Sequence, residues 1–166
     1  MHDEPLNPLD DPDTDPFEVA AAAAADIARL TGVDSHDIAL TLGSGWGKAA
    51  DLIGETVATI PATDVTGFSK PALEGHVGSL RSIRTPKGKH VLVIGARTHY
   101  YEGHGPRRVV HSVRTAAATG AKLSGTCPPL LFMGIRTASG TDPTPISEIS
   151  WIGCRPWAEH LLFATA

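Results

Sequence analysis

The stretch ARTHYYEGHG, residues 96–105, is the densest group of polar side chains in the sequence and follows directly on an apolar run. Only 19% of the chain is charged and 5% is aromatic, so packing alone rarely explains such a concentration. Arg97 suits bidentate recognition of a phosphate, and His99 can add a second hydrogen-bond donor. Tyr101 can bond a sugar hydroxyl, and Glu102 can orient a neighbouring histidine. The stretch therefore indicates a site for phosphate and a sugar, the alternative being an exposed strand end with a surface salt bridge.

Two earlier loops offer further polar groups between glycines. In LGSGWG, residues 42–47, Ser44 lies at a strand-to-helix turn where backbone N–H groups and a helix N-terminus can bind an anion. A structural turn with a capping serine would look the same, since the lysine of a P-loop is absent. In LEGHVG, residues 73–78, His76 can donate to phosphate or move a proton, or it can be an ordinary loop residue.

No metal site is expected from the histidines of the polar stretch. His99 and His104 are five residues apart, and no carboxylate or cysteine lies at a supporting spacing.

The elements that must position these loops are marked by their ends. Asp15 can cap a helix that begins at Pro16 and is followed by Gly32. Apolar and alternating segments indicate strands, and turn signals separate them. The expected strands cover residues 38–42, 55–60, 79–84 and 89–97, with a hairpin turn at 85–88 and a short helical stretch from 48 to about 53.

The last of these strands leads into the polar stretch. If its geometry persists, Arg97, His99 and Tyr101 project to one face. A helix is then expected from Pro106 to a stop at Gly120. Its apolar face is expected to consist of Val109, Val113, Ala116 and Ala117. This alternation of elements predicts an α/β domain in which helices cover a mixed sheet.

Bulk composition narrows the classes of function. The chain has 166 residues, of which 42% are hydrophobic, enough for one sizeable core. A net charge of -4 gives no basic surface for nucleic acid or an anionic membrane. The alanine run at 20–25 is too short to span a bilayer. Two cysteines make neither a disulfide framework nor a four-ligand metal site, so we expect a reducing, cytoplasmic setting.

The three motifs, in this order and at these separations, resemble those of the trimeric class of purine nucleoside phosphorylases. That family has a GSGLG phosphate loop, a GH loop and an R-x-H-x-Y-E-G motif after a strand. Here these read GSGWG, EGHVG and RTHYYEG, and VVHSVRTAAATGAK is similar to the helix that follows. The third motif does not fit the R-H-G-like version of methylthioadenosine phosphorylases. The match covers roughly residues 17–122.

The resemblance implies a three-layer α/β/α fold with a mixed central sheet and the phosphorolysis of inosine- or guanosine-type nucleosides to purine and ribose 1-phosphate. It implies no metal or organic cofactor, because inorganic phosphate is a co-substrate, and it implies a homotrimer. Arg97 and His99 would be catalytic, Tyr101 would bind ribose and Glu102 would orient its neighbours. The phosphate-binding residues would be Ser44, His76, Arg97 and His99, with His76 beside the phosphate or the ribose 5′-hydroxyl.

The sequence departs from the family pattern after Lys122. There the family continues with an apolar strand and an N-A-A-G-G-like turn, whereas this chain reads LSGTCPPLLFMG and has no lysine from 123 to 166. The glutamate and asparagine that recognise the purine have no counterpart. We therefore expect the C-terminal half to be missing and interpret residues 123–166 as an atypical tail produced by a reading-frame shift.

The sequence thus divides into a flexible, acidic, Pro-rich tail (1–15), the N-terminal part of a phosphorylase domain (16–122) and the atypical tail (123–166). Two alternatives to an active phosphorylase stay open. One is an inactive fragment, or a remnant that binds phosphate or nucleoside. The other is an unrelated small α/β domain with a chance set of motifs.

Overall fold

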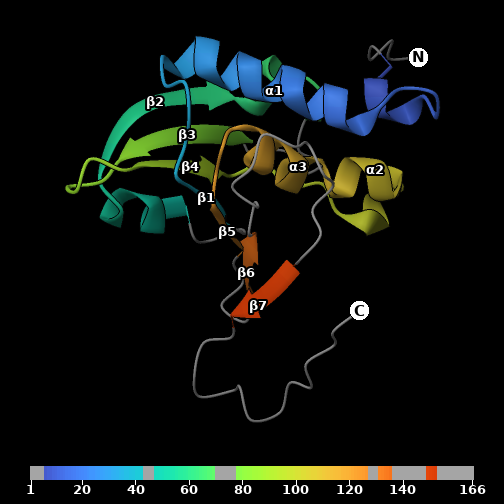
Figure 1. The fold of residues 1–166 in the computed structure, drawn as a ribbon. Helices are drawn as coiled ribbons and strands as arrows, with labels where there is room; N and C mark the ends of the chain where they lie inside the picture. Colours follow the sequence, from blue (N-terminus) through green and yellow to red (C-terminus); the bar gives the residue numbers. More distant parts are fainter. Residues whose placement is uncertain (1–5, 43–46, 70–77, 127–130, 136–148, 153–166) are drawn as a thin grey trace.

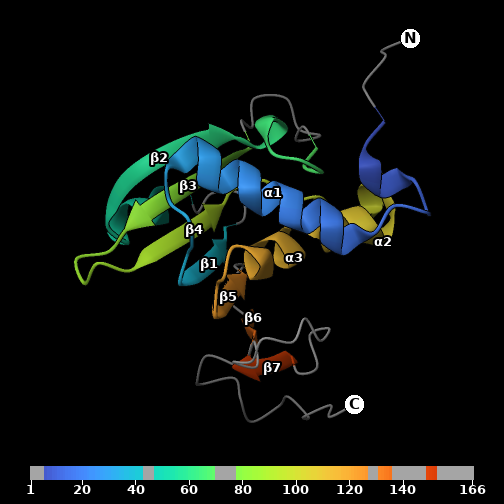
Figure 2. The same cartoon turned by 45° about the horizontal axis from the view of Figure 1, so that its top comes forward.

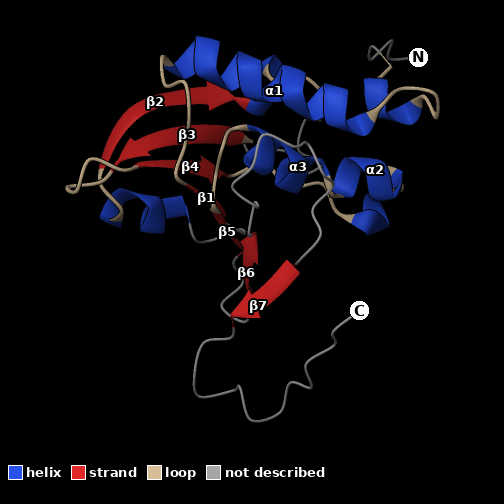
Figure 3. Cartoon of the chain, in the orientation of Figure 1, coloured by secondary structure: helices blue, strands red, loops and turns tan. Residues whose placement is uncertain are grey.

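The computed structural model describes residues 6–42, 47–69, 78–126, 131–135 and 149–152. The strands in these ranges are β1 (Ile38–Thr41), β2 (Glu55–Pro61), β3 (Ser79–Arg84), β4 (His90–Ile94), β5 (Leu123–Thr126), β6 (Leu131–Ile135) and β7 (Ile149–Ile152). They form one sheet in the order β2-β3-β4-β1-β5-β6-β7 (Figures 1 and 3). β1 is parallel to both of its neighbours, and every other pair is antiparallel. The mixed sheet is the one that the sequence predicts.

Helices cover both faces of this sheet. α1 (Pro16–Thr31) lies across one face, with α3 (His111–Ala118) beside it (Figure 2). The short 3₁₀ helix η2 (Gly47–Leu52) packs its buried Ala50 on the opposite face. The remaining helical elements are η1 (Pro8–Asp10), η3 (Ala62–Asp64), η4 (Tyr100–Glu102) and α2 (Gly105–Val109). The expected α/β fold with helices on the two faces of a mixed sheet is confirmed.

The core follows the alternation of side chains along the central strands. In β4, Leu92 and Ile94 pack under α1, together with Leu80 of β3 and Ile27 of the helix. The intervening Val91 and Val93 pack on the other face with Ala50 and Ile83. Because β4 is covered on both faces, it reads as an unbroken apolar run rather than an alternating one.

The ends of α1 lie where the sequence predicts them. The side chain of Asp15 accepts a hydrogen bond of 2.8 Å from the backbone N–H of Phe17. At the other end, Gly32 adopts φ 69° and donates to the carbonyl of Ala28 at 2.9 Å. Both are standard ways of satisfying backbone groups that a helix end leaves unpaired. The predicted strands and the hairpin turn at 85–88, where Gly88 has φ 75°, are also present.

The helix expected from 106 to 120 is instead two helices. α2 ends at Val109, and Val110 at φ -90° and ψ 0° separates it from α3. The fully buried residues of α3 are His111, Thr115 and Ala116, whereas Val109 and Val113 are only half-buried. Of the residues expected on the apolar face of this helix, Ala116 is buried, and Val109, Val113 and Ala117 are half-buried.

Residues 6–15, part of the expected flexible tail, are packed on the fold. Leu9 is only 2% exposed, and Asn7 Nδ2 donates to the carbonyl of Gly67 at 3.0 Å. Asp10 forms an ion pair with Arg108. This part of the segment differs from the expectation because its few apolar and acidic side chains find partners on distant elements. Residues 1–5 lie outside the described ranges.

β5 extends the sheet past Lys122, parallel to β1. The pattern of elements thus continues beyond the position at which the sequence suggests a break. The interpretation of residues 123–166 as frame-shifted and the division of the chain at 122 stay predictions.

The residues that the structure describes contain neither a membrane-spanning helix nor a metal-binding group. Within those ranges, no helix is both long and apolar enough to cross a membrane. The same residues bring together no group of three or more His, Cys, Asp or Glu side chains that could hold a metal ion.

Candidate active site

The described ends of the three motif loops meet at one edge of the sheet. Thr41, at the end of β1, pairs with Ile94, at the end of the parallel strand β4. Leu42 N–H donates to the carbonyl of Ile94 at 3.1 Å. β3 begins at the same edge, where Gly95 N–H donates to the carbonyl of Ser79 at 2.8 Å. The segments that lead to Ser44 and to Arg97 therefore begin beside each other. The segment that follows His76 ends next to them, at the start of β3.

This edge is where α/β sheets of this kind commonly bind ligands. After β1 the chain forms β2, β3 and β4 on one side of β1 and then crosses to form β5 on the other side, so the direction of the connections reverses at β1. Carboxyl ends of parallel strands on either side of such a reversal leave a crevice between diverging loops. The sheet topology thus favours a ligand site at the motif loops, independently of their composition.

The backbone makes a close approach just before the polar stretch. A Cβ atom on Gly95 would lie 2.9 Å from the carbonyl oxygen of Ser79. β4 ends at Ile94, and Gly95 makes one further backbone hydrogen bond to Ser79 of β3. Residues 100–102 then form η4, which Gly103 closes at φ 79°. The conditional prediction of a strand continuing through Arg97, His99 and Tyr101 was therefore wrong.

Arg97 has an unsatisfied buried donor. Its side chain is half-buried, and its Nε atom is buried with no hydrogen-bond partner in the described part of the chain. A buried N–H that lacks a partner is costly, and such groups commonly have a ligand or water as their partner. Among the predicted site residues in the described ranges, Arg97 thus shows the clearest sign of an anion-binding role.

The other predicted residues are placed to different extents. His99 is half-buried beside Arg97, in extended backbone at φ -104° and ψ 147°. The Glu102 side chain is 13% exposed, and one carboxylate oxygen lies 3.9 Å from Nε2 of His104. The orienting role of Glu102 stays a prediction. Ser44, His76 and the side chain of Tyr101 lie outside the described residues.

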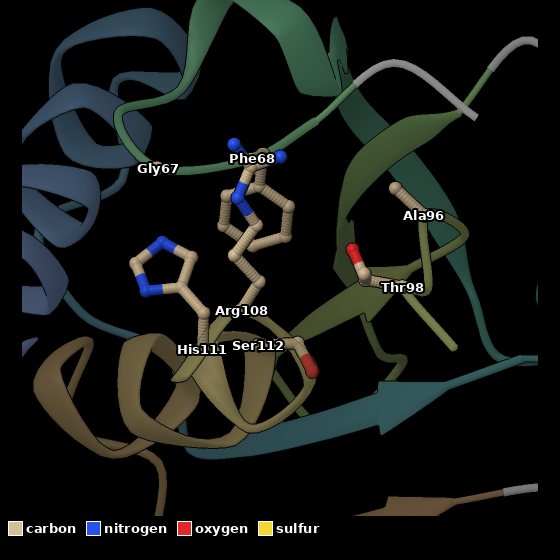
Figure 4. Close-up of a pocket in the computed structure, with 7 residues that line it drawn as sticks. All are labelled: Gly67, Phe68, Ala96, Thr98, Arg108, His111 and Ser112. Atoms are coloured by element: carbon tan, nitrogen blue, oxygen red, sulfur yellow. The ribbon is translucent and has the colours of Figure 1, made fainter. Parts of the chain in front are cut away.

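A small pocket lies beside the polar stretch (Figure 4). Three segments line it: Gly67 and Phe68, Ala96 and Thr98, and Arg108, His111 and Ser112. Arg108 and His111 are not among the residues predicted from the sequence, because both lie in helices, outside the motif loops. The partial signal for them is the run of basic residues that follows the polar stretch in GPRRVVHSVR.

Residues 66–69, which lead into the EGHVG loop, are held by four separate parts of the chain. Asp26 of α1 accepts hydrogen bonds from the backbone N–H (3.0 Å) and hydroxyl (2.6 Å) of Thr66. Nε2 of His111 lies 2.9 Å from the carbonyl oxygen of Thr66, and the two Phe68 and His111 rings meet edge to face. The contacts from Asn7 and Arg108 complete the set: Asn7 bonds Gly67, and Arg108 bonds Ser69 at 3.1 Å.

Two of the anchoring groups, Asp26 and His111, have pKa values below their usual ones. The hydrogen bond from the Thr66 hydroxyl holds the pKa of Asp26 below its usual value, with Arg29 acting in the same direction. Burial lowers the pKa of His111, and the positive charge of Arg114 adds to this effect. His111 is therefore a neutral structural anchor at ordinary pH, with its Nε2–H donated to Thr66.

Comparisons with known proteins agree with this geometry. The chain is 60% identical over 119 residues to a purine nucleoside phosphorylase of Cellulomonas sp, across 69% of this chain and 42% of that relative. It is 46% identical over 114 residues to the purine nucleoside phosphorylase of Mycobacterium tuberculosis, across 68% of this chain and 42% of that protein. No family model matches the chain.

Solved structures give the same result. The purine nucleoside phosphorylase of Schistosoma mansoni in complex with acetate matches with a TM-score of 0.57 and 32% identity, over 66% of this chain and 39% of that chain. The structure of the enzyme from the same organism in complex with inosine matches with a TM-score of 0.56 and 31% identity, over 66% and 37% of the two chains.

The fold is that of an α/β protein of the nucleoside phosphorylase class. The chain belongs to the purine nucleoside phosphorylase family. It spans about two fifths of the length of the relatives that it matches.

Proposed function

We propose that the chain carries the phosphate- and ribose-binding part of a purine nucleoside phosphorylase. The reaction of that enzyme is the phosphorolysis of inosine- or guanosine-type nucleosides to free purine and ribose 1-phosphate. The observation that carries the proposal is the meeting of the described ends of the motif loops at the carboxyl edge of β1 and β4, together with the buried Nε of Arg97, which has no hydrogen-bond partner among the described residues.

The proposed roles follow from the chemistry of each side chain. Arg97 and His99 hold the phosphate and are the catalytic residues, with Ser44 and His76 as further phosphate ligands. Arg97 contributes a fixed positive charge and a planar set of donors that match phosphate oxygens. Tyr101 contacts the ribose, and Glu102 orients a neighbouring histidine.

These residues suit a reaction that needs positioning more than covalent chemistry. As the C–N glycosidic bond breaks, the anomeric carbon becomes cation-like, and a phosphate oxygen forms the new C–O bond to it. A phosphate held beside the sugar therefore serves as both nucleophile and counter-charge. Inorganic phosphate is a co-substrate, and no metal or organic cofactor takes part in the proposed reaction.

A second candidate is a remnant that binds phosphate or nucleoside without turnover. The observation that favours it is the sequence after Lys122, which does not continue the family pattern. We also infer a homotrimer and a cytoplasmic location, the first from the family resemblance and the second from the low cysteine content.

Phosphate binding and turnover separate these possibilities. Inosine and phosphate are mixed with the purified chain while purine release is followed spectroscopically, and thermal melts are recorded with and without phosphate. Turnover that Arg97→Gln abolishes supports the enzyme, and a phosphate-dependent rise in Tm without turnover supports the remnant. Arg84→Gln is the matched control, because Arg84 is an exposed arginine at the opposite end of β3. A folded chain with neither turnover nor a phosphate effect would overturn the proposal.

A further inference from the structure

Residues 7–14, here called the strap, are bonded to α2. The side chain of Leu9 is buried. The guanidinium of Arg107 donates to the carbonyl oxygens of Asp11, at 2.6 Å, and Thr14. The strap is therefore a docked part of the fold, and it lies against the helix that directly follows the polar stretch.

Arg108 links the strap to two segments of the candidate site. Its Nε donates to one carboxylate oxygen of Asp10 at 2.7 Å, and its Nη2 donates to the other oxygen. Its Nη1 donates to the hydroxyl of Ser69 at 3.1 Å and lies 3.3 Å from Nδ1 of His104. The side chain of Arg108 is only 12% exposed.

The planar guanidinium explains why this link is stiff. Once Nε and Nη2 are bonded to the two oxygens of Asp10, the direction of Nη1 is determined. Nη1 then points at Ser69 and His104 with little freedom left. A lysine could satisfy one of these three partners but not all of them.

The contact to His104 supports the turn that carries the predicted site residues. Because Arg108 donates to Nδ1 of His104, the proton of that imidazole is on Nε2, which faces Glu102 at 3.9 Å. The turn itself contains local hydrogen bonds, from Glu102 N–H to His99 and from Gly103 N–H to Tyr100. These bonds join neighbours in sequence. Arg108, in contrast, connects the turn to Asp10, which lies 98 residues before Arg108 in the sequence.

We propose that Asp10 and Arg108 are a positioning pair for the turn formed by residues 97–104. Asp10 holds the guanidinium, and the guanidinium holds His104 and Ser69, so the turn keeps the geometry that its ligand requires. Both residues act through others: Asp10 through Arg108, and Arg108 through His104 and Ser69. The proposal rests on the proposed function for the identity of that ligand, which we take to be phosphate.

Amide hydrogen exchange tests the positioning directly, without activity or ligand. Asp10→Asn removes the charge that orients Arg108, and we expect the amides of Glu102 and Gly103 to exchange severalfold faster. Arg108→Lys is expected to have the same effect with the cation retained. Asp13→Asn is the control, because Asp13 lies on the same strap and its described hydrogen bond uses its backbone N–H.

Phosphate affinity is measured on the same proteins from the concentration dependence of Tm. We expect Asp10→Asn to weaken phosphate binding on the order of tenfold and Asp13→Asn to leave it unchanged. Amides in the core of α1 report on global folding. If Asp10→Asn does not fold, Asp10→Glu, which keeps the charge but displaces the carboxylate, takes its place.

The outcomes distinguish this proposal from the proposed function. Wild-type exchange at Glu102 and Gly103 in folded Asp10→Asn and Arg108→Lys overturns the positioning pair, whatever phosphate does. Equal acceleration in Asp13→Asn overturns it as well. A wild-type chain that phosphate does not stabilise contradicts the proposed function, while the exchange rates still decide whether Asp10 and Arg108 position the turn.

Discussion

Nε2 of His111, in α3, lies 2.9 Å from the carbonyl oxygen of Thr66, and the same ring leaves no room for a side chain at residue 67. The helix thereby fixes the backbone immediately before one of the three motif loops. A Cβ atom on Gly67 would lie 2.6 Å from Nε2 of His111, in a backbone conformation with φ 79°. Two independent constraints therefore require glycine at this position.

Gly67→Ala is expected to lower the free energy of unfolding more than Gly88→Ala. Gly88 has a similar φ of 75°, but a Cβ atom there would meet nothing within 4 Å. Gly88→Ala should thus cost about 1 kcal/mol for backbone strain, and Gly67→Ala about 1 to 3 kcal/mol more for the clash. Urea unfolding of both variants measures the difference. Equal losses would show that the His111 ring moves aside freely.

Leu92→Ala is expected to destabilise the chain by about 2 to 5 kcal/mol. Leu92 is fully buried in the central strand β4, where a truncated side chain would leave a cavity under α1. Leu52→Ala, the same substitution at a leucine that is 89% exposed, should change stability by about 0.5 kcal/mol or less. Chemical denaturation measures the free energy of unfolding of both variants. Similar losses in the two would contradict the placement of Leu92 in the core.

Stability is expected to fall as the pH drops from about 6.5 towards 4, because of His36. Burial, with a smaller effect of the nearby His90, lowers the pKa of His36 from 6.5 to about 4. Below pH 6.5 the unfolded chain takes up a proton that the folded chain refuses, so unfolding becomes easier. The loss has a limit of about 3 kcal/mol for this one group. Above pH 6.5 the imidazole is neutral in both states and contributes no pH dependence.

His36→Gln provides the comparison for this pH effect. Glutamine can still bond Ser82, which lies 2.9 Å from Nε2 of His36, but it does not titrate. The free energy of unfolding, measured in urea between pH 7.5 and 5, should therefore vary less in this variant than in the wild type. The same slope in both proteins, or an NMR titration of His36 near pH 6.5, would rule out the assignment.

Asp15→Ala is expected to cost about 1 kcal/mol of stability, because the first turn of α1 loses its cap. Asp13→Ala removes the same charge two residues earlier, where no helix end depends on the side chain, and serves as control. Thermal melts, followed through the helical signal in circular dichroism, compare the Tm of the two variants. A loss as large in Asp13→Ala would indicate a general charge effect rather than a capping interaction.

Much of the fold could be predicted because its determinants are local. Asp15, Pro16 and Gly32 specify the ends of α1 through contacts made within the first and last turns. The apolar run in β4 specifies a strand buried on both faces, and Gly88 specifies the turn before it. Each of these features depends on neighbours in sequence. The motif residues were found for a related reason, because their chemical types and order are written in the sequence alone.

Tertiary structure decided how those parts meet and where they stop. β4 ends at Ile94, where its pairing with both β1 and β3 ends, and not at Arg97. The N-terminal segment is docked because Asp10 meets Arg108 and Leu9 finds a buried position. His111 is an anchor because Thr66 lies beside it. The amino-acid sequence by itself determined the elements and the reactive side chains, whereas the meeting of the strand ends that lead to the motif loops depends on contacts between residues tens of positions apart.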